Sequence, residues 1–225
     1  MHDSILKNTS ICFDLDGTLV DTAPDLLRVL NVVIARDGLA PVSSESIRAL
    51  IGFGALAMIK KAYANAGREL GDSHALAQLK LFLELYAAEL YRKSRTYPGV
   101  FEVLRGLKQA GSSLSVCTNK PGAMARPLLE QMGLACFFER IVGSEDTRAR
   151  KPAAEHIFTA AGHRGRGPIV MVGDGAPDVR AARAAGVPVI VMSYGYSPLP
   201  AEALGADLVL RDFRALPSAL IKVLR

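Results

Sequence analysis

The feature that most constrains the fold of this chain is a short apolar run that ends in two aspartates. Residues 10–13 form the run, and Asp14 and Asp16 come at its end. Gly17 and Thr18 then break the pattern. A short apolar run bounded by turn residues is typical of a buried strand, and open α/β sheets bind their ligands at the carboxyl ends of parallel strands. The sequence therefore predicts a strand that carries two carboxylates into a site.

The two carboxylates also indicate what such a site would bind. Asp14 and Asp16 are alternate residues of an extended segment, so they are expected to share a face. Two like charges held together resist joint ionisation unless a cation or a proton intervenes. Ligands that offer only oxygen suit Mg²⁺, which usually keeps waters and accepts phosphate oxygens of a substrate. Taken alone, each aspartate could equally be a turn residue after a strand.

Three further predicted strand or helix boundaries carry polar residues of types that can bind phosphate or a metal ion. Thr118 and Asn119 follow an apolar run. A hydroxyl and backbone N–H groups at such a junction can bind phosphate oxygens, although Thr-Asn is also a common turn. Lys151 precedes a proline at a predicted helix start. Asp174 ends another apolar run, and Asp178 follows four residues later.

The order of the predicted elements indicates an α/β protein with an insertion. Between residues 21 and 95 the pattern is helical, with no strand signal. The helices expected there cover residues 23–34, 44–51, 55–66 and 73–93. From residue 97 onward, strand and helix patterns alternate, which predicts a parallel sheet with right-handed crossovers. The strands expected there cover residues 114–117, 140–143, 169–172 and 187–192.

We therefore expect the first strand to return to a sheet formed by the second half of the chain. On this division, residues 1–20 and 97–225 form the α/β core, and residues 21–96 form an all-helical insertion. A chain of 225 residues is long enough to bury a sizeable core in one domain with an insertion.

The four polar segments together resemble the motifs of the haloacid dehalogenase superfamily in its phosphatase branch. The run from Asp14 to Asp21 matches the pattern Asp-x-Asp-Gly-Thr-Leu-x-Asp. Thr118, Lys151 and Asp174 match the second, third and fourth motifs in order. Within the superfamily the chain is similar to the phosphoglycolate phosphatase-like family over residues 16–21, 97–100 and 193–196. The resemblance implies a Rossmann-like core with a helical cap.

The resemblance also implies a role for each matched residue. Asp14 would attack phosphorus to form an aspartyl-phosphate. Asp16 would protonate the leaving group and then deprotonate the hydrolytic water. Thr118 and Lys151 would belong to the catalytic set and would bind the phosphate together with Asn119. The expected cofactor is Mg²⁺.

The metal and its surroundings follow from the same resemblance. Mg²⁺ would be held by Asp14, Asp174 and the backbone carbonyl of Asp16. Asp178 would not touch the metal directly but would keep Lys151 and the waters of the metal in place.

The inserted helices contain a motif that requires a choice. Residues 52–57 fit the dinucleotide fingerprint Gly-x-Gly-x-x-Gly/Ala, but a helical pattern precedes them and not a strand, so we assign them to a break between helices. In the family this break faces the substrate, which would bring Arg48 and Gly52 to the substrate's far end. A solvated Arg48 on an amphipathic helix is the alternative.

Composition narrows the class of partner. Lys and Arg number 27 and Asp and Glu 22, for a net charge of +5, which would draw in small anions. The basic residues bunch only mildly, at residues 148–151 and 163–166, without interleaved aromatics, so no nucleic-acid partner is expected. No apolar run reaches the roughly 18 residues that span a bilayer, and the N-terminus shows no signal pattern. We expect a cytoplasmic protein without a membrane partner.

The cysteines and histidines do not predict a second catalytic or metal-binding site. Cys12 and Cys117 lie in apolar runs, so buried reduced thiols are expected, and no Cys-x-x-Cys or cysteine–histidine cluster supports zinc or thiol catalysis. The histidines lack ligand spacing and are expected at the surface: His2, His74, His156 and His163.

These inferences predict a Mg²⁺-dependent phosphatase that hydrolyses a small phosphorylated metabolite, such as phosphoglycolate, through an aspartyl-phosphate. A β-phosphoglucomutase-like phosphomutase would share every core residue, and a sugar-phosphate phosphatase or a pyrophosphatase of the superfamily also fits. A dehalogenase is disfavoured because Asp16 and Mg²⁺ would be superfluous. A non-enzymatic binding module is disfavoured because every catalytic side chain is present. The sequence is compatible with a monomer or a homodimer.

Overall fold

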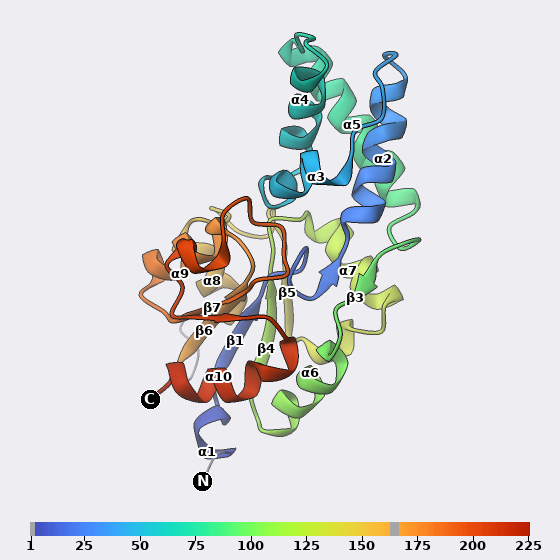
Figure 1. Cartoon of the computed structure of the whole chain (residues 1–225). Coiled ribbons are helices and arrows are strands. Elements are labelled where there is room, and N and C mark those ends of the chain that lie inside the picture. The colour runs from blue at the N-terminus through green and yellow to red at the C-terminus, as the bar shows by residue number, and fades with distance from the viewer. Residues whose placement is uncertain (1–2, 163–166) are drawn as a thin grey trace.

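A parallel sheet forms the centre of the larger lobe of the molecule (Figure 1). The computed structural model describes residues 3–162 and 167–225, and within them the six strands lie in the order β5-β4-β1-β6-β7-β8. All neighbouring strands are parallel. The strands are β1 (Ser10–Phe13), β4 (Ser113–Cys117), β5 (Arg140–Val142), β6 (Ile169–Gly173), β7 (Val189–Met192) and β8 (Leu208–Leu210). The predicted α/β class is confirmed.

Helices cover both faces of this sheet, because successive side chains of a strand point to opposite faces. Ile11 and Phe13 of β1 belong to the apolar cluster with α6, α7 and α10, whereas Cys12 packs with α8 and α9. These helices are α6 (Val100–Gln109), α7 (Gly122–Gln131), α8 (Ala154–Ala161), α9 (Ala176–Ala185) and α10 (Leu216–Val223). Because β1 lies between β4 and β6, its carboxyl end opens at the middle of the sheet.

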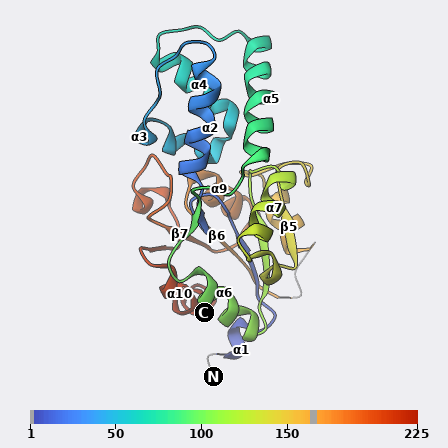
Figure 2. The same cartoon turned by 90° about the vertical axis from the view of Figure 1, so that its right-hand side faces the viewer.

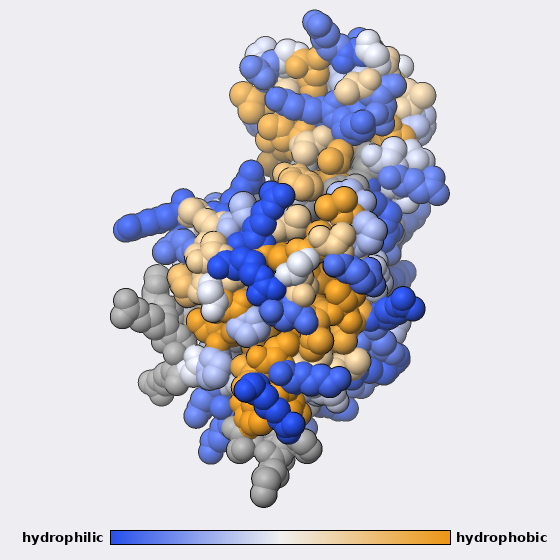
Figure 3. Space-filling model, turned by 60° about the vertical axis from the view of Figure 1, so that its left-hand side comes forward, coloured by the Kyte–Doolittle hydropathy of each residue, from blue (hydrophilic) through white to orange (hydrophobic). Residues whose placement is uncertain are grey.

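A second lobe of helices lies beyond the carboxyl end of β1, and we call it the cap (Figure 2). It consists of α2 (Ala23–Ala35), α3 (Ser44–Ile47), the 3₁₀ helix η1 (Arg48–Phe53), α4 (Ala55–Asn65) and α5 (Asp72–Ala88). Helix α5 packs along both α2 and α4. In the space-filling view a narrow waist separates the cap from the larger lobe (Figure 3).

Two short antiparallel strands connect the lobes. β2 (Val20–Asp21) pairs with β3 (Arg95–Thr96), so the chain enters the cap after β2 and leaves it before β3. The prediction of no strand from residue 21 to 95 was therefore wrong at both ends, because two-residue strands are too short to produce an alternating pattern. We propose that the cap is bounded at this strand pair, beside the predicted residues 21 and 96.

Helix α5 ends earlier than predicted, at Ala88 and not near residue 93. The buried carboxylate of Asp25 explains the difference, because its Oδ2 accepts the backbone N–H groups of residues 92–94 and the hydroxyl of Ser94. Burial alone would raise the pKa of this carboxyl, but the hydrogen bonds hold it below its ordinary value. The chain leaving α5 is thereby tied to the first turn of α2.

Some elements were not predicted from the sequence. They are the short helix α1 (Asp3–Leu6), the edge strand β8 and the C-terminal helix α10. Among the described residues, no helix combines the length and the apolar character needed to cross a membrane. Of the two mildly basic groups, Arg148 and Arg150 are exposed as expected, and residues 163–166 lie outside the described part.

The buried cysteines behave as predicted. Cys12 and Cys117 are fully buried, whereas Cys136 is exposed. Burial raises the pKa of the Cys12 thiol to about 11 and that of Cys117 well above its usual value. Thiols held in this protonated form are poor nucleophiles and poor metal ligands.

Candidate active site

The predicted site residues converge where β1, β4 and β6 end. Asp14 follows β1, Thr118 follows β4 and Asp174 follows β6, while Lys151 enters from the loop before α8. They line a cavity between the larger lobe and the cap. The same cavity is lined by Asp16, Asn119, Asp178 and Gly52. The parallel sheet thereby brings together Asp14 and Asp174, which are 160 positions apart in the sequence.

Lys151 lies between two carboxylates at the floor of this cavity. Its buried Nζ is 2.9 Å from Asp14 Oδ1 and 2.6 Å from Asp178 Oδ1. Burial alone would lower the pKa of Lys151, but the two carboxylates hold it above its usual value. Lys151 is therefore a permanent positive charge beside Asp14.

Asp14 is the less satisfied partner in this arrangement. Its contact with Lys151 is an ion pair without hydrogen-bond geometry, so the buried Oδ1 accepts no hydrogen bond from any described residue. Burial, partly offset by Lys151, raises the pKa of Asp14 to about 6. A buried carboxylate whose hydrogen bonds are unsatisfied is available either to a cation or to an electrophile.

Asp174 and Asp178 complete an acidic group around Asp14. One oxygen of each of the three carboxylates lies within 4.8 Å of the others. Asp178 is fully engaged, because Oδ1 meets Lys151 and Oδ2 accepts the backbone N–H groups of residues 174 and 175. Burial and the neighbouring carboxylates raise the pKa of Asp174. Oxygen ligands that repel one another in this way fit a hard divalent cation.

Gly17 makes room for this acidic group. Its φ of +92° is a left-handed value that favours glycine, and a Cβ at this position would lie 2.5 Å from Asp174 Oδ2. The turn after the two aspartates therefore packs directly against the carboxylate that follows β6. Thr18 adds a hydrogen bond from its Oγ1 to Asp174 Oδ1 at 3.0 Å.

Asp16 faces the cap side of the cavity. Thr22, at the entry to α2, donates its hydroxyl to Asp16 Oδ1 at 2.7 Å. Lys120 Nζ lies 3.2 Å from Oδ1 and 3.3 Å from Oδ2. The sequence-based reasoning gave Lys120 no role, although it follows Thr118 and Asn119 at the end of β4. Its position at that strand end is the signal that could have identified it.

Comparison with known proteins identifies the family of this chain. The family model described as haloacid dehalogenase-like hydrolase matches residues 11–192. The chain belongs to the haloacid dehalogenase-like hydrolases. Two bacterial relatives named phosphoglycolate phosphatase are similar over nearly the whole chain. The protein of Caulobacter vibrioides is 42% identical, covering 100% of this chain and 94% of its own, and that of Agrobacterium fabrum is 45% identical, covering 94% and 92%.

A solved structure has the same fold as this haloacid dehalogenase-like hydrolase. The crystal structure of a predicted phosphoglycolate phosphatase from Haemophilus somnus superposes with a TM-score of 0.87 and 31% identity, covering 95% of this chain and 98% of that one. The predicted family and the predicted enzyme class, a phosphatase, are confirmed by these relatives.

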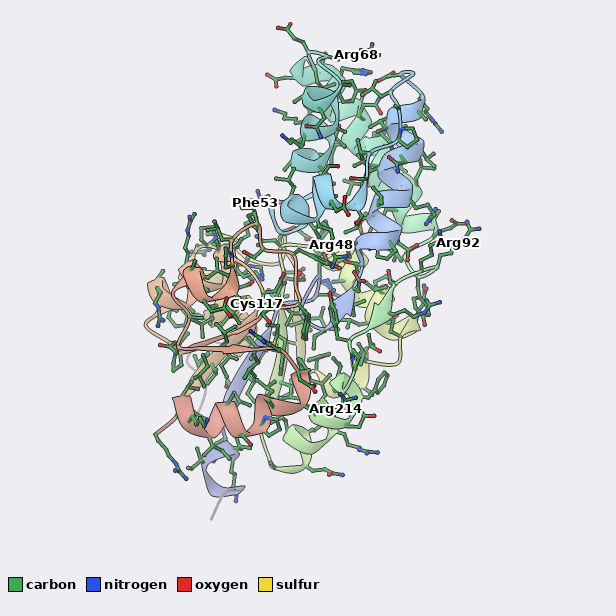
Figure 4. The ribbon with its side chains drawn as sticks, viewed as in Figure 1. Arg48, Phe53, Arg68, Arg92, Cys117 and Arg214 are labelled. Carbon is green, nitrogen blue, oxygen red and sulfur yellow. The ribbon has the colours of Figure 1, made fainter. Side chains whose placement is uncertain are left out.

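The remaining predicted substrate residues lie where the two lobes meet: Asn119, Gly52 and Arg48. Asn119 donates its amide to the carbonyl of Lys151 at 3.1 Å and to that of Gly52 at 3.5 Å. Arg48 lies over the ring of Tyr196, 4.6 Å from its centroid, and 3.8 Å from Asp21 Oδ1. Arg48 and Phe53 are both at the end of the cap that faces the larger lobe (Figure 4).

Tyr196 is a second residue whose role the sequence did not reveal. Its backbone N–H donates to Asp174 Oδ2 at 2.7 Å, while its hydroxyl accepts the backbone N–H of Thr22 at 2.7 Å and donates to Asp21 Oδ1 at 2.6 Å. One residue therefore links the carboxylate of Asp174 to the strand that leads into the cap.

His156 is buried, so its predicted surface position was wrong. Its Nδ1 accepts the backbone N–H of Lys151 at 3.1 Å, and its Nε2 lies 3.2 Å from the carbonyl of Val142, which requires that Nε2 carry the proton. His74 is exposed as predicted, and His2 and His163 lie outside the described residues. His156 thus fixes the backbone from which Lys151 reaches the site.

We expect this histidine to make the hydrolase less stable in mild acid. Burial, aided by the charge of Lys151, lowers the pKa of His156 from 6.5 to about 4. Only the unfolded chain binds a proton there between these values, so stability falls as the pH falls. From pH 7 to pH 5 the loss is about 1.5 to 2 kcal/mol. Urea unfolding at both pH values should show a smaller loss for His156→Gln than for the wild type. Equal losses would contradict the assignment.

Proposed function

We propose that this chain is a Mg²⁺-dependent phosphatase that hydrolyses phosphoglycolate or a similar small phosphomonoester through an aspartyl-phosphate. The observation that carries the proposal is the pairing of Asp14 with Lys151. A buried carboxylate whose Oδ1 accepts no hydrogen bond, 2.9 Å from a permanent cation, suits attack on a phosphorus atom that brings further negative charge.

The proposed metal site uses the acidic group of the larger lobe. Asp14, Asp174 and the backbone carbonyl of Asp16 would hold Mg²⁺, and Asp178 would act through its contacts with Lys151 and the loop. When bound, Mg²⁺ would offset the negative charge of the phosphoryl oxygens and of the carboxylates around them. Burial, together with repulsion from neighbouring carboxylates, raises the pKa values of Asp14 and Asp174, which supports a cation at this place.

The proposed reaction has two steps. In the first, a carboxylate oxygen of Asp14 forms a bond to phosphorus, the bond from phosphorus to the ester oxygen breaks, and Asp16 gives its proton to that oxygen. In the second, Asp16 takes a proton from water, the water oxygen attacks phosphorus, and the carboxylate of Asp14 leaves. Lys151 and the hydroxyl of Thr118 bind the equatorial phosphoryl oxygens throughout.

The names of the relatives and the charge of the chain support a small anionic substrate. A net charge of +5 favours the approach of such molecules, and the cap restricts the space beyond the phosphoryl group. Exclusion of water by cap closure and release by opening would complete the cycle. The cytoplasmic location and the choice between monomer and homodimer stay predictions.

Phosphate release from a substrate panel with Mg²⁺ tests the proposal. The panel contains phosphoglycolate, glucose 6-phosphate, β-glucose 1-phosphate and pyrophosphate, and the readout is kcat/KM. We expect phosphoglycolate to give the highest value. Conversion of β-glucose 1-phosphate to glucose 6-phosphate without free phosphate would identify a phosphomutase, and preference for pyrophosphate or a sugar phosphate would assign those activities instead.

Arg48 is proposed to bind the carboxylate of the substrate, with Gly52 beside it. Arg48 is half-buried, so paired hydrogen bonds to a carboxylate would be partly desolvated. Arg48→Ala should lower kcat/KM for phosphoglycolate roughly 30- to 1000-fold and leave that for p-nitrophenyl phosphate nearly unchanged. Arg36→Ala, at an exposed arginine of the cap, is the matched control. An equal loss on both substrates would contradict carboxylate binding.

A further inference from the structure

Lys120 is a buried cation for which the proposed reaction has no use. Its side chain is almost fully buried, and it lines the cavity beside Asp16. Burying a lysine is costly unless its charge and its hydrogen bonds are satisfied. Burial alone would lower its pKa, but Asp16 and Tyr86 hold it above the usual value.

The partners of Lys120 come from both lobes. In the larger lobe, Nζ contacts both carboxylate oxygens of Asp16, at 3.2 and 3.3 Å. In the cap, Nζ donates to the hydroxyl of Tyr86 at 2.8 Å and lies 4.5 Å from the centre of its ring. Tyr86 belongs to α5 and is buried, so its hydroxyl is held in place by the packing of the cap.

The other partner of Asp16 also depends on the cap. Thr22, which donates to Oδ1, is the residue directly before α2. Among the described residues, both side chains that contact the Asp16 carboxylate therefore lead to cap helices, one through the chain itself and one through Lys120 and Tyr86. Both contact Oδ1, and Lys120 also contacts Oδ2, so these two side chains together fix the orientation of the carboxylate.

We infer that Lys120, held by Tyr86 of α5, is the positioning residue that orients Asp16 toward the leaving oxygen of the substrate. The inference rests on the proposed acid role of Asp16. Lys120 keeps its own proton, while the proton that Asp16 supplies in its proposed acid role passes to the ester oxygen as the bond to phosphorus breaks. The cap then contributes to the first chemical step as well as enclosing the substrate.

A pair of substrates that differ in leaving group tests this inference. Ethyl phosphate releases a basic alkoxide that needs the proton of Asp16, whereas p-nitrophenyl phosphate releases a stable phenolate that does not. The readout is the ratio of the two kcat/KM values, which covers the steps up to release of the alcohol. Because both values come from one sample, the ratio does not depend on the fraction of folded enzyme.

We expect Lys120→Met to lower kcat/KM for ethyl phosphate roughly 10- to 100-fold, with a change of less than about 3-fold for p-nitrophenyl phosphate. Tyr86→Phe, which removes only the hydroxyl, should lower the ethyl phosphate value about 3- to 10-fold and keep the same pattern. Lys80→Met, at an exposed lysine of α5, is the matched control and should leave the ratio unchanged.

The variant Asp16→Asn separates this inference from the proposed function. If Lys120 acts through Asp16, adding Lys120→Met to Asp16→Asn changes the ratio no further. If Asp16→Asn leaves the ratio unchanged, the proposed acid role is wrong. If Asp16→Asn changes it but Lys120→Met does not, only the inference about Lys120 fails. A loss confined to phosphoglycolate would overturn it too, because Lys120 would then bind the substrate carboxylate.

Discussion

Asp14→Asn abolishes phosphate release, with an expected fall in kcat of at least about 10⁴-fold, because an amide oxygen is too weak a nucleophile to form the acyl phosphate. The substitution keeps the shape of the side chain and removes one of three crowded carboxylates. Lys151 keeps its shorter contact with Asp178, at 2.6 Å. The variant should therefore fold, with a melting temperature equal to or above that of the metal-free wild type.

The measurement is phosphate release under saturating substrate with Mg²⁺, alongside thermal unfolding. Asp72→Asn, at an exposed aspartate at the start of α5, is the matched control and should retain full activity. If folded Asp14→Asn turned over substrate within about 10-fold of the wild type, Asp14 could not be the nucleophile.

Asp174→Asn should remove both the activity and the response to Mg²⁺. Asp174 is the carboxylate proposed to share the metal with Asp14, so without it the metal has lost one of its two charged ligands. We expect a fall in kcat of at least about 10³-fold at a Mg²⁺ concentration that saturates the wild type. Ca²⁺ should inhibit the wild type, because its looser coordination would misplace the nucleophile.

The free energy of unfolding gives an independent test of Asp174 as a metal ligand. Mg²⁺ at 100 times its Kd should stabilise the wild type by about 2.7 kcal/mol, and this stabilisation should be absent in Asp174→Asn. Without metal, the variant should be no less stable than the wild type, because the substitution relieves repulsion between buried carboxylates. A wild type that works at its full rate in excess EDTA, or an Asp174→Asn variant that still gains stability from Mg²⁺, would contradict the metal site.

Apart from Lys151, which precedes a predicted helix start, the main site residues that the sequence predicted lie at or just after the ends of apolar runs. Asp14, Thr118 and Asp174 each follow a buried strand, and the parallel sheet brings these strand ends together. The longer helices of the cap, α2, α4 and α5, were also predicted, since their apolar spacing is regular over several turns. Local pattern was sufficient in these cases because each side chain's position follows from the element that precedes it. The helix predicted over residues 44–51 is instead the short α3 followed by the 3₁₀ helix η1.

The residues that sequence reasoning missed depend on contacts between distant segments. Lys120 acquires its surroundings from Tyr86, 34 residues away in another lobe, and a surface lysine would give the same local pattern. The burial of His156 could not be predicted from the sequence of its own helix, because its partners lie outside that helix. They are the carbonyl of Val142 and the backbone N–H of Lys151. The early end of α5 has the same cause, a buried carboxylate at Asp25.

The intermediate itself provides the most direct test of the proposed function. Wild-type enzyme is mixed with phosphoglycolate and Mg²⁺, quenched in acid within one turnover and reduced with borohydride, which converts an aspartyl-phosphate into homoserine. Mass spectrometry of the peptide that contains residues 10–22 then reports the position of the modification. We expect homoserine at position 14 alone, dependent on both substrate and Mg²⁺. Homoserine at another position, or an unmodified Asp14 with phosphate attached elsewhere, would contradict the proposed nucleophile.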